Sequence, residues 1–179
     1  ISPTRPEHVA DYFQDNLAVV LDGGACKNGI ESTIIGFEKE EPVLYRLGSI
    51  SLEALNKVVG PIIIKNKKEV APNAPGMLAR HYAPNTSTYL VDDVESFIKD
   101  FPEQKIGVLQ FQNVLIAPNV VISKVLSPQG DFKEAAAKLY ASLHQLDRLA
   151  LDMIVAERFP DRDLGKSIND RLTRATKKK

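Results

Sequence analysis

The sequence contains a single cysteine, Cys26, and this scarcity excludes two classes of small protein. One thiol cannot form an intramolecular disulfide framework, and it cannot build a zinc site from several cysteines. A lone cysteine is consistent with a reducing cytoplasm, so we expect a cytoplasmic protein. Cys26 itself reads as a small apolar side chain near a turn.

Neither sign of charge is in excess, because Lys and Arg number 23 and Asp and Glu also number 23. A nucleic-acid footprint would therefore have to be a local patch. The composition is that of an ordinary soluble globular protein, and it predicts no membrane partner. The chain opens at Ser2-Pro3-Thr4 without an initiator methionine or an apolar leader, so we read no targeting segment and expect the chain to be incomplete.

Residues 1–65 are predicted to form a β-rich piece with flanking helices. Pro6 follows a possible cap at Thr4, and apolar residues then recur at helical spacing, which predicts a short helix over 6–15. The apolar run Leu17–Leu21 ends at a pair of glycines. This pattern predicts a buried strand that runs into a tight turn.

A hairpin and a second helix are expected next. Ser32–Phe37 and Val43–Leu47 read as its two strands, with an acidic stretch between them. A helix capped by Ser49 or Ser51 should end at Gly60, since glycine followed by proline is a helix stop.

Residues 66–86 contain Pro72, Pro75, Gly76 and Pro84 and carry little hydrophobic periodicity, which predicts an interdomain linker. Beyond it, strands and helices alternate, as in a parallel sheet with helical crossovers. We therefore expect a small Rossmann-like parallel α/β domain over 87–179. It has no Gly-x-Gly-x-x-Gly after its first strand, which weakens an oxidoreductase interpretation. The expected strands are 88–91, 106–111, 120–125 and 153–156, and the expected helices are 94–99, 132–149 and 164–175.

Three groups of residues could carry chemistry. The hydroxyls of Ser32 and Thr33 follow a flexible Gly-Ile-Glu turn, although such hydroxyls usually satisfy local backbone groups. Arg46 lies in a strand otherwise built for burial, so it needs an anionic partner, either a protein carboxylate or a ligand phosphate. His81 and Tyr82 lie consecutively in a proline-bracketed loop that either covers a ligand or simply packs against its neighbour.

Other polar residues receive weaker interpretations. His8 and His144 lie in helical contexts without a second metal ligand at suitable spacing, so each is read as structural or solvent-facing. Arg171 and Arg174, with the Lys177–Lys179 end, could contact RNA phosphates, but a solvated tail is the more ordinary interpretation.

Several ordered motifs, spread over nearly the whole chain, resemble the long form of bacterial threonylcarbamoyl-AMP synthase. In that family a YrdC-like catalytic domain is joined by a linker to a Rossmann-like extension. The motifs are Ser2-Pro3-Thr4, Leu21-Asp22-Gly23-Gly24, Gly29-Ile30-Glu31-Ser32-Thr33-Ile34, Tyr45-Arg46-Leu47-Gly48, Pro75-Gly76-Met77, His81-Tyr82-Ala83-Pro84 and Asp170-Arg171-Leu172-x-Arg174-Ala175.

The resemblance implies the ATP-dependent conversion of L-threonine and bicarbonate to threonylcarbamoyl-AMP and pyrophosphate, a step toward threonylcarbamoyladenosine in tRNA. ATP would be a substrate with Mg²⁺ on its phosphates, and the product would pass to a tRNA-modifying transferase complex. Direct tRNA contact is left open.

By the same resemblance, Ser32 would bind L-threonine and Arg46 would reach the ATP phosphates. Ser2 or Thr4 would lie on the ATP side, and Tyr82, with His81 as the weaker candidate, would close over the nucleotide. No residue is assigned a catalytic role.

The chain departs from the family pattern at its front. The Lys-x-Arg and Ser-x-Asn elements that the family carries ahead of Ser-Pro-Thr are missing. We therefore expect residues 1–65 to be the C-terminal portion of a YrdC-like domain, and this chain alone to be inactive. The competing interpretation is a non-catalytic module that binds a nucleotide or a protein and regulates a separate catalytic domain.

Overall fold

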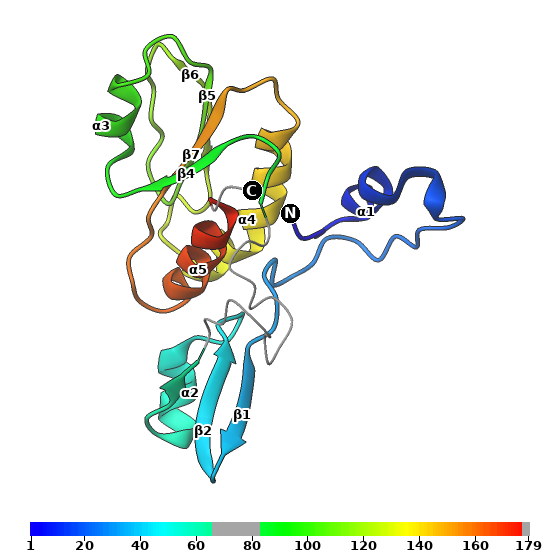
Figure 1. The fold of residues 1–179 in the computed structure, drawn as a ribbon, viewed down its shortest axis with the longest axis vertical. Coiled ribbons are helices and arrows are strands. Elements are labelled where there is room, and N and C mark those ends of the chain that lie inside the picture. The colour runs from blue at the N-terminus through cyan, green and yellow to red at the C-terminus, as the bar shows by residue number, and fades with distance from the viewer. Residues whose placement is uncertain (66–82, 177–179) are drawn as a thin grey trace.

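The computed structural model describes residues 1–65 and 83–176, and within them the chain forms a mixed α/β structure with two β-sheets. Figure 1 shows the larger sheet and its helices as one body, with a smaller hairpin unit beside it and an N-terminal segment that projects to one side. The predicted α/β class is confirmed. None of the helices in the described ranges is both long enough and apolar enough to span a membrane.

The larger sheet has four strands in the order β4-β7-β5-β6, and every neighbouring pair is parallel. Parallel neighbours require crossover connections, and helices α3, α4 and α5 lie between or after the strands in sequence. The elements are β4 (Thr88–Val91), α3 (Val94–Lys99), β5 (Ile106–Gln110), β6 (Val120–Val125), α4 (Phe132–Asp147), β7 (Met153–Glu157) and α5 (Gly165–Ala175).

This sheet is buried on both faces, which makes the unit a three-layer α/β fold. Along β7, Ile154 and Ala156 pack on the side of α4 and α5, whereas Met153 and Val155 pack on the side of α3. Successive side chains along a strand point to opposite faces of the sheet, so the continuous apolar run of β7 contributes residues to both hydrophobic cores. The Rossmann-like expectation for this part of the chain is thereby confirmed.

The smaller sheet is built on the predicted hairpin of β1 (Ile34–Glu38) and β2 (Glu41–Arg46), which pair in antiparallel fashion. Lys39 and Glu40 form the two-residue turn, and both have positive φ, as the right-handed twist of a hairpin favours. α2 (Leu52–Val59) follows, capped by the Ser51 hydroxyl, and the short β3 (Ile63–Ile64) adds to β2 in parallel.

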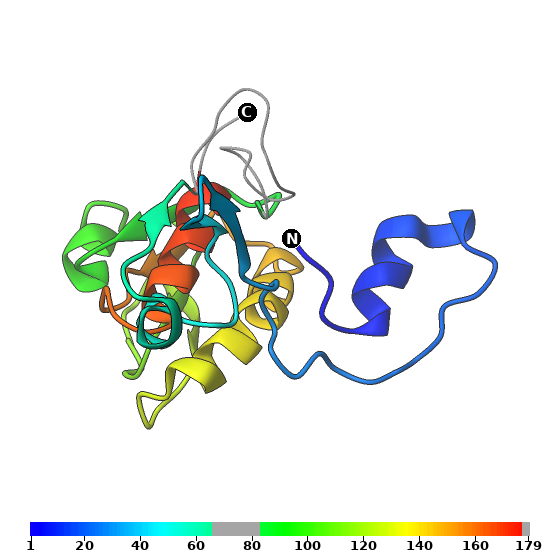
Figure 2. The same ribbon diagram turned by 90° about the horizontal axis from the view of Figure 1, so that it is seen from below.

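The N-terminal segment corrects one sequence-based prediction. α1 (Pro6–Phe13) forms as expected, although its N-cap residue is Arg5 rather than Thr4, and a short 3₁₀ turn follows at Gln14–Asn16. The strand predicted at Leu17–Leu21 is absent from this described segment, and Val19 and Leu21 are 72% and 88% exposed. An apolar run becomes a strand only when a neighbour pairs with its backbone, and Figure 2 shows this segment looping away from both sheets.

The predicted domain limits of 1–65, 66–86 and 87–179 stay predictions, since residues 66–82 lie outside the described residues.

Candidate substrate site at the mouth of the hairpin

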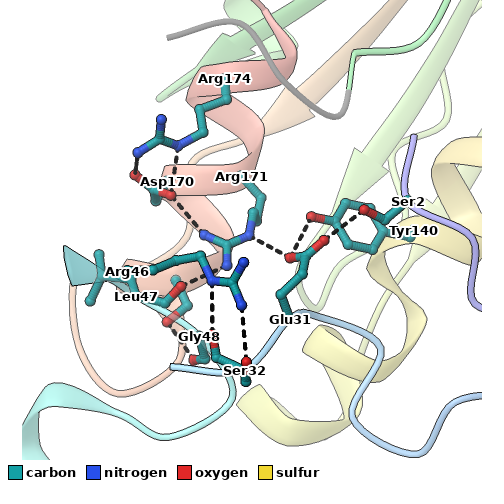
Figure 3. Close-up of polar contacts among 11 residues, drawn as sticks. Ser2, Glu31, Ser32, Arg46, Leu47, Gly48, Tyr140, Asp170, Arg171 and Arg174 are labelled. Carbon is teal, nitrogen blue, oxygen red and sulfur yellow. Dashed lines mark hydrogen bonds and ion pairs between the residues drawn. The ribbon is translucent and has the colours of Figure 1, made fainter. Parts of the chain in front are cut away.

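Ser32 and Arg46 lie together at the open end of the hairpin, where β2 ends (Figure 3). The Arg46 Nε donates to the Ser32 carbonyl oxygen at 2.9 Å, and its Nη2 donates to the Ser32 hydroxyl at 2.9 Å. Ser32 is exposed and Arg46 is half-buried. Two hydrogen bonds to one residue fix the plane of the guanidinium group and place a hydroxyl against a cation.

The hairpin register explains this proximity. Arg46 is the register partner of Ile34, two residues after Ser32, so the antiparallel pairing returns the chain to the same point. Gly48 then approaches the opposite strand closely, because a Cβ at this position would lie 2.3 Å from the Ser32 carbonyl carbon. The Ser49 backbone N–H also donates to the Glu31 carbonyl oxygen at 3.0 Å. The glycine thus permits the two ends of the hairpin to meet.

Glu31, just before Ser32, is a second centre of polar contacts. Its carboxylate accepts hydrogen bonds from Ser2 Oγ at 2.6 Å, from Tyr140 Oη at 3.1 Å and from Arg171 Nε at 2.8 Å. Burial alone would raise the pKa of Glu31, but the nearby Arg171 charge and these hydrogen bonds hold that pKa below its usual value. Glu31 is therefore an ionised, firmly held carboxylate at neutral pH.

Arg171 of α5 joins the larger α/β unit to this region. Its side chain is fully buried, and besides Glu31 it donates to the Leu47 carbonyl oxygen at 2.6 Å and to Asp170 Oδ2 at 2.7 Å. Asp170 in turn receives Nε and Nη2 of Arg174 at 2.9 and 3.0 Å. A buried guanidinium requires such complete pairing, because an uncompensated buried charge is strongly destabilising.

The chemistry of this site suits a polar, anionic ligand. Ser32 offers a hydroxyl that can donate or accept, and Arg46 offers a planar donor group suited to carboxylate or phosphate oxygens. A guanidinium group beside an exposed hydroxyl suits an anionic ligand, because charge-assisted hydrogen bonds to such a ligand are strong.

The structure places the other predicted site residues differently. Ser2 donates a hydrogen bond to Glu31, the residue before Ser32. Thr4 is buried, and its backbone N–H donates to His8 Nδ1 at 3.1 Å, away from Ser32. His81 and Tyr82 lie outside the described residues.

The weaker interpretations can also be compared with the structure. His8 and His144 stack with ring centroids 3.8 Å apart, which agrees with their structural interpretation. Arg171 and Arg174 are 1% and 6% exposed, so the RNA-contact interpretation is wrong for these two arginines as they lie here. Lys177–Lys179 lie outside the described residues.

Sequence reasoning missed the role of Glu31, Asp170 and Arg171. The sequence placed Asp170 in a C-terminal motif, Arg171 in that motif and among possible RNA contacts, and Glu31 in a turn and a family motif, but it predicted no contact among them. Arg171 and Glu31 are 140 positions apart, and nothing in the local pattern around either residue predicts such a contact.

No group of three or more His, Cys, Asp or Glu side chains in residues 1–65 and 83–176 could hold a metal ion. A groove of about 560 Å³ lies between α3 and residues 114–119, with a mainly apolar lining. α3 lies at the end of the molecule opposite the hairpin in Figure 1, so this groove is separate from Ser32 and Arg46.

Comparison with protein families gives two matches. Residues 50–176 match the family described as "Threonylcarbamoyl-AMP synthase, C-terminal domain". Residues 1–48 match a family described as "Telomere recombination". The two matches together cover almost all of the chain.

Curated proteins and a solved structure are also similar to this chain. The chain is 32% identical to the threonylcarbamoyl-AMP synthase of Pyrococcus abyssi, covering 98% of this chain and 54% of that protein. It is 31% identical to the synthase of Bacillus subtilis, covering 97% of this chain and 53% of that protein. A crystal structure of P. abyssi Sua5 complexed with L-threonine matches with a TM-score of 0.85 at 33% identity, over 98% of this chain and 54% of that one. The chain thus spans about half the length of the relatives it matches.

Proposed function

The chain belongs to the threonylcarbamoyl-AMP synthase family, and from that membership we propose that it forms part of an enzyme that makes threonylcarbamoyl-AMP. The substrates would be L-threonine, bicarbonate and ATP, and the second product would be pyrophosphate. The observation that carries the proposal is the pairing of Ser32 with Arg46, which sets a hydroxyl beside a guanidinium group. The similar P. abyssi structure complexed with L-threonine supports a threonine site in this fold.

The reaction has two chemical steps. The amine of L-threonine attacks bicarbonate and forms a carbamate with loss of water. A carbamate oxygen then attacks the α-phosphorus of ATP, and the bond from that phosphorus to the bridging oxygen of pyrophosphate breaks. In this scheme Ser32 hydrogen-bonds the threonine, and Arg46 stabilises the negative charge that develops on the phosphate oxygens.

The remaining ligand assignments are part of the same proposal. Ser2 would lie on the ATP side, where its contact with Glu31 supports a place beside the Ser32–Arg46 pair. Thr4 is the weaker candidate, since it is buried next to His8. Tyr82, with His81 as the second choice, would cover the bound nucleotide. Mg²⁺ would enter with the ATP phosphates, whose oxygen atoms are ligands that this ion prefers.

We propose further that this chain alone lacks full activity. It matches about half the length of its relatives, and the Lys-x-Arg and Ser-x-Asn elements of the family are missing from it. The product would pass to a tRNA-modifying transferase complex in the cytoplasm.

The experiment that tests the proposal compares this chain with the full product of its gene. Pyrophosphate release that depends on L-threonine, bicarbonate and ATP is expected from the full product, with little from residues 1–179 alone. Arg46→Ala should weaken ATP binding about tenfold or more, and Ser32→Ala should weaken L-threonine binding, because each variant removes a charged or polar contact to ligand.

Lys57→Ala, an exposed change on α2, is the matched control and should leave both affinities unchanged. Unchanged ATP affinity in Arg46→Ala would remove the phosphate role. A full gene product without synthase activity that still binds nucleotide would favour the regulatory module instead.

A further inference from the structure

Arg171, in the C-terminal motif, contacts residues next to the candidate site, but the proposed reaction gives it no role. Arg171 lies on α5 of the larger α/β unit, whereas Ser32 and Arg46 lie on the hairpin unit. Its fully buried guanidinium reaches Glu31, the residue before Ser32, and the carbonyl of Leu47, the residue after Arg46. One side chain therefore holds the immediate neighbour of each ligand-binding residue (Figure 3).

The contacts of Arg171 form a clamp across the mouth of the hairpin. Nε binds Glu31 at 2.8 Å and Nη2 binds the Leu47 carbonyl oxygen at 2.6 Å, so both ends of the hairpin meet one planar group. Asp170 holds Nη1 at 2.7 Å, which fixes the orientation of that plane. Ser167, one turn earlier on α5, donates to the Gly48 carbonyl oxygen at 2.8 Å and adds a second point of attachment.

We propose that Arg171 is a positioning residue, through which α5 sets the geometry of the Ser32–Arg46 pair and thereby the affinity for L-threonine. This inference rests on the proposed function, and it gives the larger α/β unit a part in the substrate site. Arg171 acts through Glu31 and Leu47 rather than by contact with substrate. Because ligand contacts lose strength steeply with small misplacement, release of this clamp lowers affinity without removing any ligand-binding group.

The alternative is that Arg171 only stabilises the packing of the two units. A residue of that kind lowers stability, and its variants lose function only as far as they unfold. Asn169 provides a matched comparison on the same helix. It is buried, and its side chain exchanges two hydrogen bonds with the backbone of Phe159, within the larger α/β unit. Asn169→Ala therefore disturbs α5 without touching the hairpin clamp.

The test measures L-threonine affinity by calorimetry and melting temperature in the full gene product. Arg171→Met is expected to weaken L-threonine binding about tenfold, and Arg171→Lys, which keeps the charge near Glu31, should recover part of that loss. Asn169→Ala should lower the melting temperature yet leave the affinity of the folded protein unchanged. Equal losses of affinity in Arg171→Met and Asn169→Ala would overturn the positioning role.

A double-mutant cycle separates positioning from an independent effect. If Arg171 acts through Ser32, then Arg171→Met should add little to the loss already caused by Ser32→Ala. Full additivity of the two losses would contradict the proposal.

An NMR measurement tests the inference even if Arg171→Met does not fold or if L-threonine does not bind. The ¹H–¹⁵N signal of the Arg46 Nε–H reports its hydrogen bond to Ser32, and it should shift in Arg171→Lys but not in Asn169→Ala. An unchanged signal in Arg171→Lys would overturn the inference even if Arg171→Met did not fold. Absence of L-threonine binding in the wild-type protein would instead refute the proposed function, and the Arg46 signal would still decide whether Arg171 sets the pair.

Discussion

At the scale of single residues, the site depends on close approaches that tolerate no added atoms. Gly48 shows this most directly, since a Cβ at this position would lie 2.3 Å from the Ser32 carbonyl carbon and 2.5 Å from the Glu31 carbonyl oxygen. These are backbone atoms, which cannot turn away as the end of a flexible side chain can. The glycine is therefore required by contact between the two chain segments that carry Ser32 and Arg46.

We accordingly expect Gly48→Ala to lower the free energy of unfolding by about 1–3 kcal/mol, because the backbone must shift to admit the new methyl group. Urea denaturation measures the change. Gly23→Ala is the control, since nothing lies within 4 Å of a Cβ built there, and it should be nearly neutral. A loss no larger in Gly48→Ala than in Gly23→Ala would show that the close approach relaxes easily.

At the scale of elements, α4 contacts the site directly, because its Tyr140 hydrogen-bonds Glu31 and its His144 hydrogen-bonds the N-terminal segment. The start of this helix is well defined. Asp131 is its N-cap and accepts hydrogen bonds from the backbone N–H groups of Lys133 and Glu134 at 2.7 and 3.2 Å. Such a cap satisfies donors that have no partner inside the helix.

Asp131→Ala should therefore cost about 1 kcal/mol of stability, whereas Asp131→Ser, which keeps a capping oxygen, should cost much less. Thermal unfolding followed by circular dichroism compares the two variants. Equal losses would mean that the residue stabilises the fold by its charge alone, since serine retains the cap and lacks the charge.

At the scale of the whole molecule, the N-terminal segment is attached to α4 through a pair of histidines. His144 Nε2 donates to the Ser2 carbonyl oxygen at 3.1 Å, and its ring stacks on that of His8. Arg148 of the segment after α4 also pairs with Asp11 of α1. The pKa of His144 is lowered from 6.5 to about 4, first by burial and next by the neighbouring charge of His8. Burial likewise lowers the pKa of His8.

This arrangement predicts acid sensitivity with a defined sign. Between pH 6.5 and about 4 the unfolded chain binds a proton at His144 that the folded chain does not, so the free energy of unfolding should fall as the pH drops through that window. Chemical denaturation at a series of pH values measures the slope. His144→Gln should make the slope shallower, and an unchanged slope in that variant would rule out His144 as its source.

Much of the secondary structure could be predicted from the sequence. β4, β6 and α3 have the predicted limits, and α2 (Leu52–Val59) has Ser51 as its N-cap and Gly60 as its C-cap, because local periodicity and caps decide such elements. The pairing of the two hairpin strands follows from their spacing, and the family resemblance points to Ser32 and Arg46, but only the structure shows their contact. The strand predicted at Leu17–Leu21 was wrong, because a strand needs a neighbouring backbone to pair with, and no local sequence pattern shows whether one is present.

The sequence by itself determined most of the elements, the α/β class and two of the residues at the candidate site. Only the tertiary structure decided that Arg171 of the last helix holds Glu31 and Leu47, and so flanks Ser32 and Arg46. The physical reason is that these interactions act over very different separations along the chain. Hydrophobic period, caps and turns act over a few residues, whereas a buried ion pair across 140 positions exists only once two separately packed units come together.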